Sequence, residues 1–426
     1  MALIHISRHA FTRCIAAICV LAIGAQIAAA HAAPTAIEQF QTYQAALAKD
    51  AQSKDWKAYL ADAKQLKDFL HDAPTSRLEV ARTYLRLGNQ AAALAETRGF
   101  LALGQTNTAL ASPLFDPIRS AIAAQIEQNQ SAISHASTVF ELPETASLPE
   151  DIDFDPSTKQ FFITAVLGKK IVSVDLHGVS RTFAEAPDGW PMVALKIDPK
   201  HRRLWVTEVA FSDFKNIAPA DRGHSVLLEY DLDHGHLLSR IEGPAHSGLG
   251  DMALTADGEP IVSDGDDGGV YRVDHEAFRR IDHGEFISPQ TPAFCDGSKI
   301  AFVPDYVRGL ARLNLETGKV VWLRADRHAL YGIDGLYCHG HTLTATQNGA
   351  TPARVVEFKL DAAGTAVIGE RVIERGTSSA SDVTHGVFVS NIFYFIAHAG
   401  WETLDDQGSP KPDASPTRAV LMRVAR

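Results

Sequence analysis

Residues 248–274 read GLGDMALTADGEPIVSDGDDGGVYRVD, and this stretch decides the predicted fold. It predicts a short apolar strand over residues 251–255, an Ala-Asp-Gly turn, and a second strand over residues 259–263. A polar loop of Asp and Gly follows, and then a third strand over residues 269–273. Alternating apolar residues indicate strands, and Asp-Gly between two such runs is a strong signal for a β-hairpin. The stretch therefore predicts an antiparallel meander.

The same order of strand, turn, strand, loop and strand recurs along the chain. It is found again in residues 149–175, 193–231, 291–315, 334–361 and 385–424. Units that repeat at intervals of about 40 to 60 residues have the period of four-stranded propeller blades. The sequence therefore predicts an all-β six-bladed propeller over residues 138–426. A strand over residues 138–141 would lie beside the C-terminal strand 419–424 and close the ring, which leaves no sheet edge open.

Residues 1–32 have the pattern of a secretory signal peptide. Arg8 and Arg13 precede an apolar run over residues 15–30, and Ala30-His31-Ala32 offers a cleavage site between small residues. The run is too short and too rich in Ala for a membrane anchor, although an uncleaved anchor is the alternative. We therefore expect a periplasmic or secreted protein that begins near Ala33 and has no stable membrane insertion.

The chain has a net charge of −11. An acidic protein of this kind excludes nucleic acid and anionic lipid as expected partners. After the signal peptide, the chain contains two cysteines, Cys295 and Cys338, at matching positions of adjacent units (AFCDG and LYCHG). Two cysteines are not a disulfide framework, so we expect each to pack as a small buried apolar residue. A single bridge between them is the alternative.

Residues 33–132 are rich in Ala, Leu, Gln and Lys, with apolar residues at helical spacing. Small and aromatic residues fall at the spacing of a tetratricopeptide repeat, namely Ala81, Tyr84, Gly88 and Ala93. We predict a short, degenerate tetratricopeptide-like domain of four or five helices over residues 33–132. It could offer a groove to a protein partner; the alternative is a packing cap on the propeller or a dimerisation surface.

The turn that ends the innermost strand of each unit sets a register. We count back from each turn in steps of two residues, because every second side chain of a strand points to the same face. This count predicts which residue of each unit lies nearest the propeller axis. These residues are Glu150, Val193, Asp251, Thr291, Asp334 and His385. The two layers beneath them are almost wholly apolar.

Three carboxylates and an imidazole facing one axis predict a cation site, because uncompensated like charges raise one another's pKa. The predicted metal ligands are Glu150, Asp334, Asp251 and His385. Carboxylates suit Ca²⁺, Mg²⁺ or Mn²⁺, and an imidazole adds Zn²⁺, so the metal is not assigned. The alternative is that each acid caps a turn or binds a backbone amide.

Three of these strands resemble those of the gluconolactonase, regucalcin and luciferin-regenerating-enzyme family. Residues 150–156, EDIDFDP, resemble its opening strand, in which the Glu is a metal ligand. Ile333-Asp334-Gly335-Leu336 is similar to the strand whose Asp is a ligand and the catalytic base, and Gly250-Asp251-Met252-Ala253 resembles an element that touches substrate. The resemblance covers about residues 139–426 and implies a metal-dependent lactonase with Asp334 as catalytic residue.

The chain also departs from that family. The third ligand there is an Asn in the fourth blade, whereas residues 288–292 of this chain read SPQTP. Gln290 or Thr291 would have to stand in for it, and His385 is not expected in the family's metal site. The ends of the second strands form the rim, so Asp264, Asp305 and Asn348 join Gln290 and Thr291 as predicted substrate-binding residues. The alternative is that the rim acids serve turns.

These observations lead to two functional hypotheses. The first is a metal-dependent hydrolase that acts on a small hydroxylated lactone or ester in the central cavity. The second is a non-catalytic periplasmic propeller that binds a small ligand or a protein partner, with the helical domain as a docking surface. The sequence has no Gly-x-Ser-x-Gly motif and no Gly-rich phosphate loop, which disfavours a serine hydrolase or a nucleotide enzyme.

Overall fold

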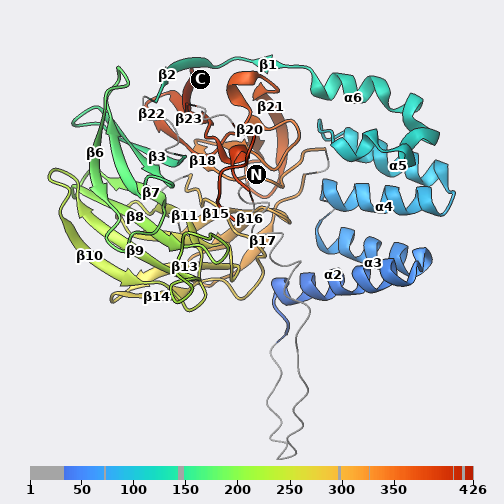
Figure 1. The fold of residues 1–426 in the computed structure, drawn as a ribbon, viewed down its shortest axis with the longest axis horizontal. Coiled ribbons are helices and arrows are strands. Elements are labelled where there is room, and N and C mark those ends of the chain that lie inside the picture. Colours follow the sequence, from blue (N-terminus) through green and yellow to red (C-terminus); the bar gives the residue numbers. More distant parts are fainter. Residues whose placement is uncertain are drawn as a thin grey trace, which may run out of the picture.

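The computed structural model describes residues 33–71, 73–142, 148–295, 299–325, 327–405, 407–414 and 418–425. Within these residues the α-helices come first and the strands follow (Figure 1). None of the described helices combines the length and the apolar character that a membrane crossing requires. The predicted signal peptide, residues 1–32, lies outside the described residues.

The N-terminal part is a stack of helices beside the propeller (Figure 1). In chain order it contains α2 (Ala36–Ser53), α3 (Trp56–Phe69), α4 (Pro74–Arg86), α5 (Gln90–Leu101), the 3-10 helices η1 (Thr108–Ala111) and η2 (Pro113–Ala121), and α6 (Ala123–Gln130). Ala81 on α4 and Ala93 on α5 are fully buried, because small side chains let these two helices approach closely. Gly88 ends α4 with a φ of 77°, which glycine adopts without steric cost. The predicted group of N-terminal helices is thus present.

The remaining described residues form six antiparallel sheets, so the predicted six-bladed propeller is confirmed. Blade one contains β3 (Pro149–Asp155), β4 (Gln160–Ala165), β5 (Lys170–Val174) and β6 (Ser180–Glu185). Blade two contains β7 (Met192–Asp198), β8 (Arg203–Ala210), β9 (His224–Asp231) and β10 (Leu237–Glu242). Blade three contains β11 (Leu249–Leu254), β12 (Pro260–Asp264), β13 (Gly269–Asp274) and β14 (Ala277–Arg280).

The second half of the ring follows the same plan with one irregular blade. Blade four contains β15 (Ile300–Asp305), β16 (Gly309–Asn314) and β17 (Val320–Trp322). Blade five contains β18 (Leu336–His339), β19 (Thr342–Gln347), β20 (Arg354–Leu360) and β21 (Val367–Arg375). Blade six contains β22 (Gly386–Val389), β23 (Ile392–His398) and β24 (Val420–Ala425).

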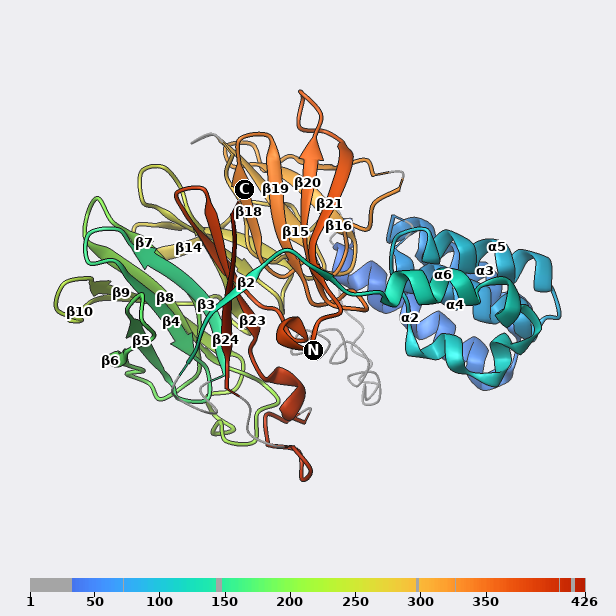
Figure 2. The same cartoon turned by 90° about the horizontal axis from the view of Figure 1, so that it is seen from above.

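The two ends of the described propeller chain close the ring in blade six. Strand β2 (Ser137–Glu141) pairs antiparallel with β24, with Thr138 opposite Met422, as predicted. The preceding β1 (Ile133–Ser134) pairs with β21 of blade five. Figure 2 shows this chain running from α6 through β1 to β2 along the propeller. One continuous segment therefore joins the helices to two neighbouring blades.

Blade four has no regular innermost strand among the described residues. Its inner segment makes two isolated bridges, Pro289 to Asp305 and Ala293 to Phe302. Pro292 lies between them and has no backbone N–H to donate, so it interrupts the strand that the repeat predicts from residue 291.

Cys295 and Cys338 form a disulfide with a Cα–Cα distance of 4.9 Å. The prediction that the two cysteines pack separately is therefore wrong, and the alternative of a single bridge holds. Their matching positions in adjacent blades are the cause, because the innermost segments converge on the axis and bring equivalent side chains together. The bridge joins the irregular segment of blade four to β18 of blade five.

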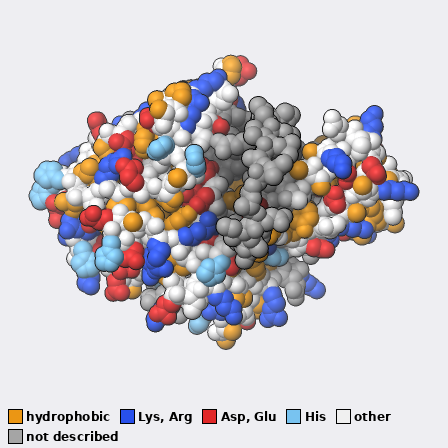
Figure 3. Space-filling model, turned by 90° about the horizontal axis from the view of Figure 1, so that it is seen from below, with side chains coloured by type: hydrophobic (Ala, Val, Ile, Leu, Met, Phe, Trp, Pro, Cys, Tyr) orange, Lys and Arg blue, Asp and Glu red, His pale blue; other side chains and the backbone are white. Residues whose placement is uncertain are grey.

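Apolar packing between blades and against the helices holds these parts together. Phe161 of blade one packs against Tyr394 of blade six, with ring centroids 5.0 Å apart and ring planes tilted by 53°. At the helices, Phe40 packs in one cluster with Ile287 of the propeller, and Ala36 N donates to Gly284 O at 2.7 Å. On the face seen in Figure 3, acidic and basic side chains are interspersed over the propeller.

Candidate metal centre

The innermost strands bring the predicted polar residues together at the propeller axis. Glu150 lies on β3, Asp251 on β11, Thr291 in the irregular segment of blade four, and Asp334 and His385 just before β18 and β22. All five are buried, with at most 6% of their surface exposed. Ligand atoms of Glu150, Asp334 and His385 lie within 4.8 Å of one another. This spacing would let two carboxylates and one imidazole share a cation.

The ring of His385 is held at both nitrogens. Nδ1 lies 2.9 Å from the backbone oxygen of Glu150, which only accepts hydrogen bonds, so Nδ1 carries a hydrogen. Nε2 lies 2.8 Å from Oδ1 of Asp251 and 2.9 Å from Oγ1 of Thr291. A backbone carbonyl on one ring nitrogen is how proteins usually orient a metal-binding histidine toward its ion. The same ring also suits an ion pair with Asp251.

Burial and mutual repulsion dominate the electrostatics of the centre. Burial raises the pKa of Glu150 well above its usual value, and Asp334 raises it further. Burial also raises the pKa of Asp334, to about 7, while His385 opposes this shift. Burial would lower the pKa of His385, but Asp151, Asp334 and Asp251 outweigh it and raise that pKa. The centre therefore has to hold protons or another cation to balance its carboxylates.

One oxygen of Asp334 is fixed and the other is not. Oδ2 accepts a hydrogen bond of 2.6 Å from Asn348 Nδ2, and Tyr306 donates to the Asn348 amide oxygen at 3.0 Å. Oδ1 is buried and has no hydrogen-bond partner among the described residues. A buried carboxylate oxygen without a partner is costly, and a divalent cation would satisfy it. The donor set thus fits a metal ion held by Glu150, Asp334 and His385.

Glu150 is oriented by a residue from the far end of the chain. Its Oε2 accepts a hydrogen bond of 2.5 Å from the indole Nε1 of Trp401, at the start of η4 (Trp401–Thr403). Asp382 accepts from the backbone N–H of Trp401 at 2.5 Å and so holds the indole in place. The sequence analysis missed Asp382, Tyr306 and Trp401 as functional residues, because no periodic pattern marks these positions.

The rim acids Asp264 and Asp305 serve loops. Asp264 Oδ1 accepts from the backbone N–H groups of Gly248 and Asp266, each at 2.9 Å. Asp305 accepts from Ile287 N at 2.6 Å and from Val307 N at 3.0 Å. Both residues are fully buried, and neither belongs to the group of ligand atoms at the axis. These hydrogen bonds are those expected for the alternative, a turn role, and the substrate role of the two residues stays a prediction.

The two predicted residues of blade four differ in their contacts. Thr291 Oγ1 donates to Asp251 Oδ1 at 2.5 Å and so belongs to the axial cluster. Gln290 donates its amide N–H groups to Ser288 and Pro289 of its own loop, each at 3.2 Å. Its amide oxygen is buried without a partner among the described residues. Asn348, predicted at the rim, contacts Asp334 directly.

Comparisons with known proteins find similar solved structures. No model of a protein family matches the chain, and no curated protein matches its sequence. Similar solved structures include regucalcin from Agrobacterium tumefaciens, with 16% identity over 68% of this chain and 92% of that one, and a TM-score of 0.47. They include a luciferin-regenerating enzyme, with 11% identity over 70% of this chain and 96% of that one, and a TM-score of 0.48.

A gluconolactonase from Xanthomonas campestris is also similar, with 13% identity over 76% of this chain and 94% of that one, and a TM-score of 0.46. The three proteins named in the predicted resemblance thus occur among the structural neighbours of this chain. This likeness concerns the architecture, and the question of activity rests on the axial residues themselves.

Proposed function

We propose that the axial centre binds a divalent cation through Glu150, Asp334 and His385, and that the protein hydrolyses a small hydroxylated lactone or ester there. The observation that carries this proposal is the convergence of two buried carboxylates and an imidazole within 4.8 Å. The unpartnered Oδ1 of Asp334 supports it, since it leaves one strong acceptor uncommitted. Carboxylates with an imidazole suit Mn²⁺ or Zn²⁺, and carboxylates alone suit Ca²⁺ or Mg²⁺.

Different residues of the chain would have different roles in this hydrolysis. A bound divalent cation would supply polarisation of a substrate carbonyl and a lowered pKa of a nearby water. Asp334 is the candidate base for the proton of this water, the role that the resemblance implies. Asn348 holds one oxygen of that carboxylate, which leaves the other oxygen to face the cation. Trp401 would orient Glu150. The backbone oxygen of Glu150 would orient His385, whose Nε2 would exchange its hydrogen bond to Asp251 for the cation.

One observation favours a second candidate function. The side chains of Asp251, Thr291 and His385 form hydrogen bonds with one another. The polar groups on this side of the centre therefore have hydrogen-bond partners without a ligand. A polar cluster of that kind would suit a non-catalytic propeller that binds a small molecule or a protein. The two functions predict different metal contents and different activities.

The deciding experiment is metal analysis of the chain purified from Ala33 onwards, together with a screen for hydrolysis of sugar lactones and aryl esters. The proposal expects about one divalent ion per chain and turnover that a chelator removes and the metal restores. A protein that contains no ion, binds none on titration and hydrolyses none of these compounds would favour the non-catalytic propeller.

We also propose that the protein is exported and acts outside the cytoplasm. The support is the Arg-flanked apolar run in residues 1–32 and its Ala-His-Ala cleavage site. N-terminal sequencing of the protein recovered from a periplasmic or culture fraction should give a start near Ala33. Recovery of a chain that retains residues 1–30 would contradict cleavage.

A further inference from the structure

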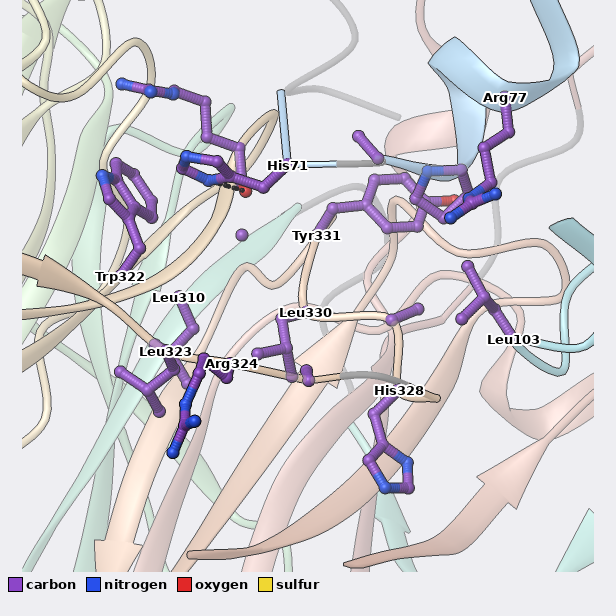
Figure 4. A pocket seen from close by; sticks show the side chains of 16 residues that line it. His71, Arg77, Leu103, Leu310, Trp322, Leu323, Arg324, His328, Leu330 and Tyr331 are labelled. Atoms are coloured by element: carbon purple, nitrogen blue, oxygen red, sulfur yellow. Dashed lines mark hydrogen bonds between the residues drawn. The ribbon is translucent and has the colours of Figure 1, made fainter. Parts of the chain in front are cut away.

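A second cavity lies away from the axis, between the helices and blades four and five. Its volume is about 420 Å³, within the range of small-molecule sites. Ala73 and Pro74 at the start of α4 and Leu103 after α5 line it on one side, and β16, β17 and residues 323–325 and 328–331 line it on the other (Figure 4). None of the axial residues lines it. Both structural parts of the molecule thus contribute to one cavity.

The lining of this cavity is strongly basic. It contains the guanidinium groups of Arg77, Arg308 and Arg324 and the imidazoles of His71 and His328. No Asp or Glu occurs among the described residues that line it. The whole chain carries a net charge of −11, so this concentration of cationic groups runs against the overall composition. A cavity of this charge favours a negatively charged ligand.

Arg308 is one of the cations that line the cavity. Its guanidinium stacks over the rings of Phe69 at 4.4 Å and Trp322 at 4.6 Å, which draws it out of water. Nη1 donates to the backbone oxygen of Glu285 at 2.5 Å, and Nε is buried without a hydrogen-bond partner among the described residues. Among the described residues this half-buried guanidinium has no hydrogen bond to a carboxylate, and an anion in the cavity would offset the cost of its burial.

Two other cations of the lining have acidic partners outside it. Arg77 of α4 pairs with Glu96 at 3.4 Å, and His328 pairs with Glu370 at the same distance. Arg324 is exposed. Helix α4 begins at the cavity with Pro74 and has no side-chain cap, so the partial positive charge of its N-terminus adds to the field.

The rest of the lining is apolar or aromatic. Figure 4 shows His71, Trp322 and Tyr331 along one side and Leu310, Leu323 and Leu330 opposite them. The Tyr331 hydroxyl is engaged with Gln105 of the helical part. We propose that this cavity binds a small organic anion, a carboxylate or phosphate with a flat or apolar body, and that the anion bridges the helices and the propeller. This proposal does not depend on the hydrolytic function proposed for the axis.

Titration calorimetry on the chain from Ala33 onwards tests this proposal with four probes: benzoate, phenyl phosphate, inorganic phosphate and benzamide. Benzoate and phenyl phosphate separate a carboxylate from a phosphate on the same ring, and benzamide keeps the ring without the charge. We expect one of the two ring-bearing anions to bind at one site per chain, and benzamide to bind about tenfold more weakly or not at all.

Three variants locate the site. Arg324→Gln and Arg308→Gln should each weaken anion binding about tenfold, and Ala325→Trp should block it by filling the cavity while keeping every cation. Arg324 is exposed, so its variant tests the proposal even if Arg308→Gln fails to fold. Arg279→Gln, on the exposed face of blade three, makes the same charge change and should alter nothing.

The axial variant Glu150→Ala should retain anion binding, which separates this site from the centre. The proposal is overturned if neither ring-bearing anion binds, or if benzamide binds as well as benzoate. It is also overturned if Glu150→Ala abolishes anion binding while Arg324→Gln and Ala325→Trp leave it intact. Because the readout is anion binding alone, a failure here is distinct from a failure of the proposed hydrolysis.

Discussion

The indole Nε1 of Trp401 donates a 2.5 Å hydrogen bond to Oε2 of Glu150, although 251 positions separate the two residues in the chain. Burial and Asp334 raise the pKa of Glu150, whereas His385 and this hydrogen bond lower it. Glu150 lies on the first strand of blade one, and Trp401 follows β23 of blade six. The contact therefore couples the axial carboxylate to the closure of the ring.

Trp401→Phe should weaken binding of Mn²⁺ or Zn²⁺ about tenfold, since residues that orient metal ligands typically contribute this much. The phenyl ring keeps most of the packing, so the fold should persist. Titration calorimetry measures the change. Trp190→Phe is the matched control, because the Trp190 indole bonds to Asp221 at 3.4 Å and not to the axial cluster. Equal affinities in the parent and Trp401→Phe would show that this hydrogen bond has no part in metal binding.

Glu150→Ala and Asp334→Ala should each abolish binding of a divalent cation, because each removes one of the three ligands. The apolar layers beneath the centre are untouched, so circular dichroism should show a retained fold. Asp334→Asn should keep part of the metal affinity through its amide oxygen, yet lose most hydrolysis, since an amide does not accept the proton.

Val193→Ala is the control for these axial variants, because Val193 is the apolar member of the same ring of positions. It should change neither metal affinity nor turnover. If Glu150→Ala binds Ca²⁺, Mn²⁺ and Zn²⁺ as the parent does, the axial metal site is wrong and the non-catalytic propeller replaces it.

Asp155→Asn should destabilise the protein by about 2 kcal/mol at neutral pH. Burial would raise the pKa of Asp155, but hydrogen bonds from Arg202, Thr158 and Ser157 outweigh burial and hold that pKa well below its usual value. A carboxyl whose folded-state pKa is lowered stabilises the fold above its unfolded pKa of about 4, and this stabilisation disappears as the pH falls further. The difference between parent and variant should therefore shrink below about pH 4.

Urea unfolding at several pH values measures this difference. Asp233→Asn is the matched control, because Asp233 pairs with the same Arg202 at 2.6 Å but is largely exposed. That variant should cost less than about 1 kcal/mol at neutral pH. A difference between the parent and Asp155→Asn that stays constant down to pH 2 would refute the assigned pKa direction.

Replacing Cys295 and Cys338 together by Ser should lower the stability of the chain from Ala33 onwards by about 3 to 4 kcal/mol. The physical reason is that the bridge closes a loop between residues 43 positions apart and so restricts the unfolded chain. The parent, denatured without reductant, should show no free thiol. Two free thiols per chain in that assay would instead support the separate packing that the sequence predicts.

The blade pattern was predictable because it depends on local chemistry. In the 248–274 stretch, the Asp257-Gly258 turn requires a backbone that glycine supplies, and Gly258 indeed has a φ of 82°. The strands β11, β12 and β13 follow the predicted order, although β12 is buried at every position and does not alternate. Counting with the same period of two also predicted that Glu150, Asp251, Asp334 and His385 lie nearest the propeller axis.

Contacts between side chains that are far apart in the sequence could not be predicted from this local pattern. Asp264 and Asp305 carry carboxylates of the kind that bind ligands. Both nevertheless accept hydrogen bonds from backbone N–H groups in the loops before their own blades. Conversely, Tyr306 and Trp401 have no ligand character, but they fix Asn348 and Glu150. A side chain's partner depends on which loop folds over it, and the spacing of residues along one strand does not predict that loop.

The sequence by itself determined the repeat, the number of blades, the strand that closes the ring and the axial register, because each follows from turn chemistry and from alternation along a single strand. Only the tertiary structure decided the partners of each polar group: the Cys295–Cys338 bridge, the cluster of Asp251, Thr291 and His385, and the basic cavity beneath α4. The physical reason is that burial forces every polar group to find a partner, and in a closed ring the nearest partner comes from another blade or from the helices.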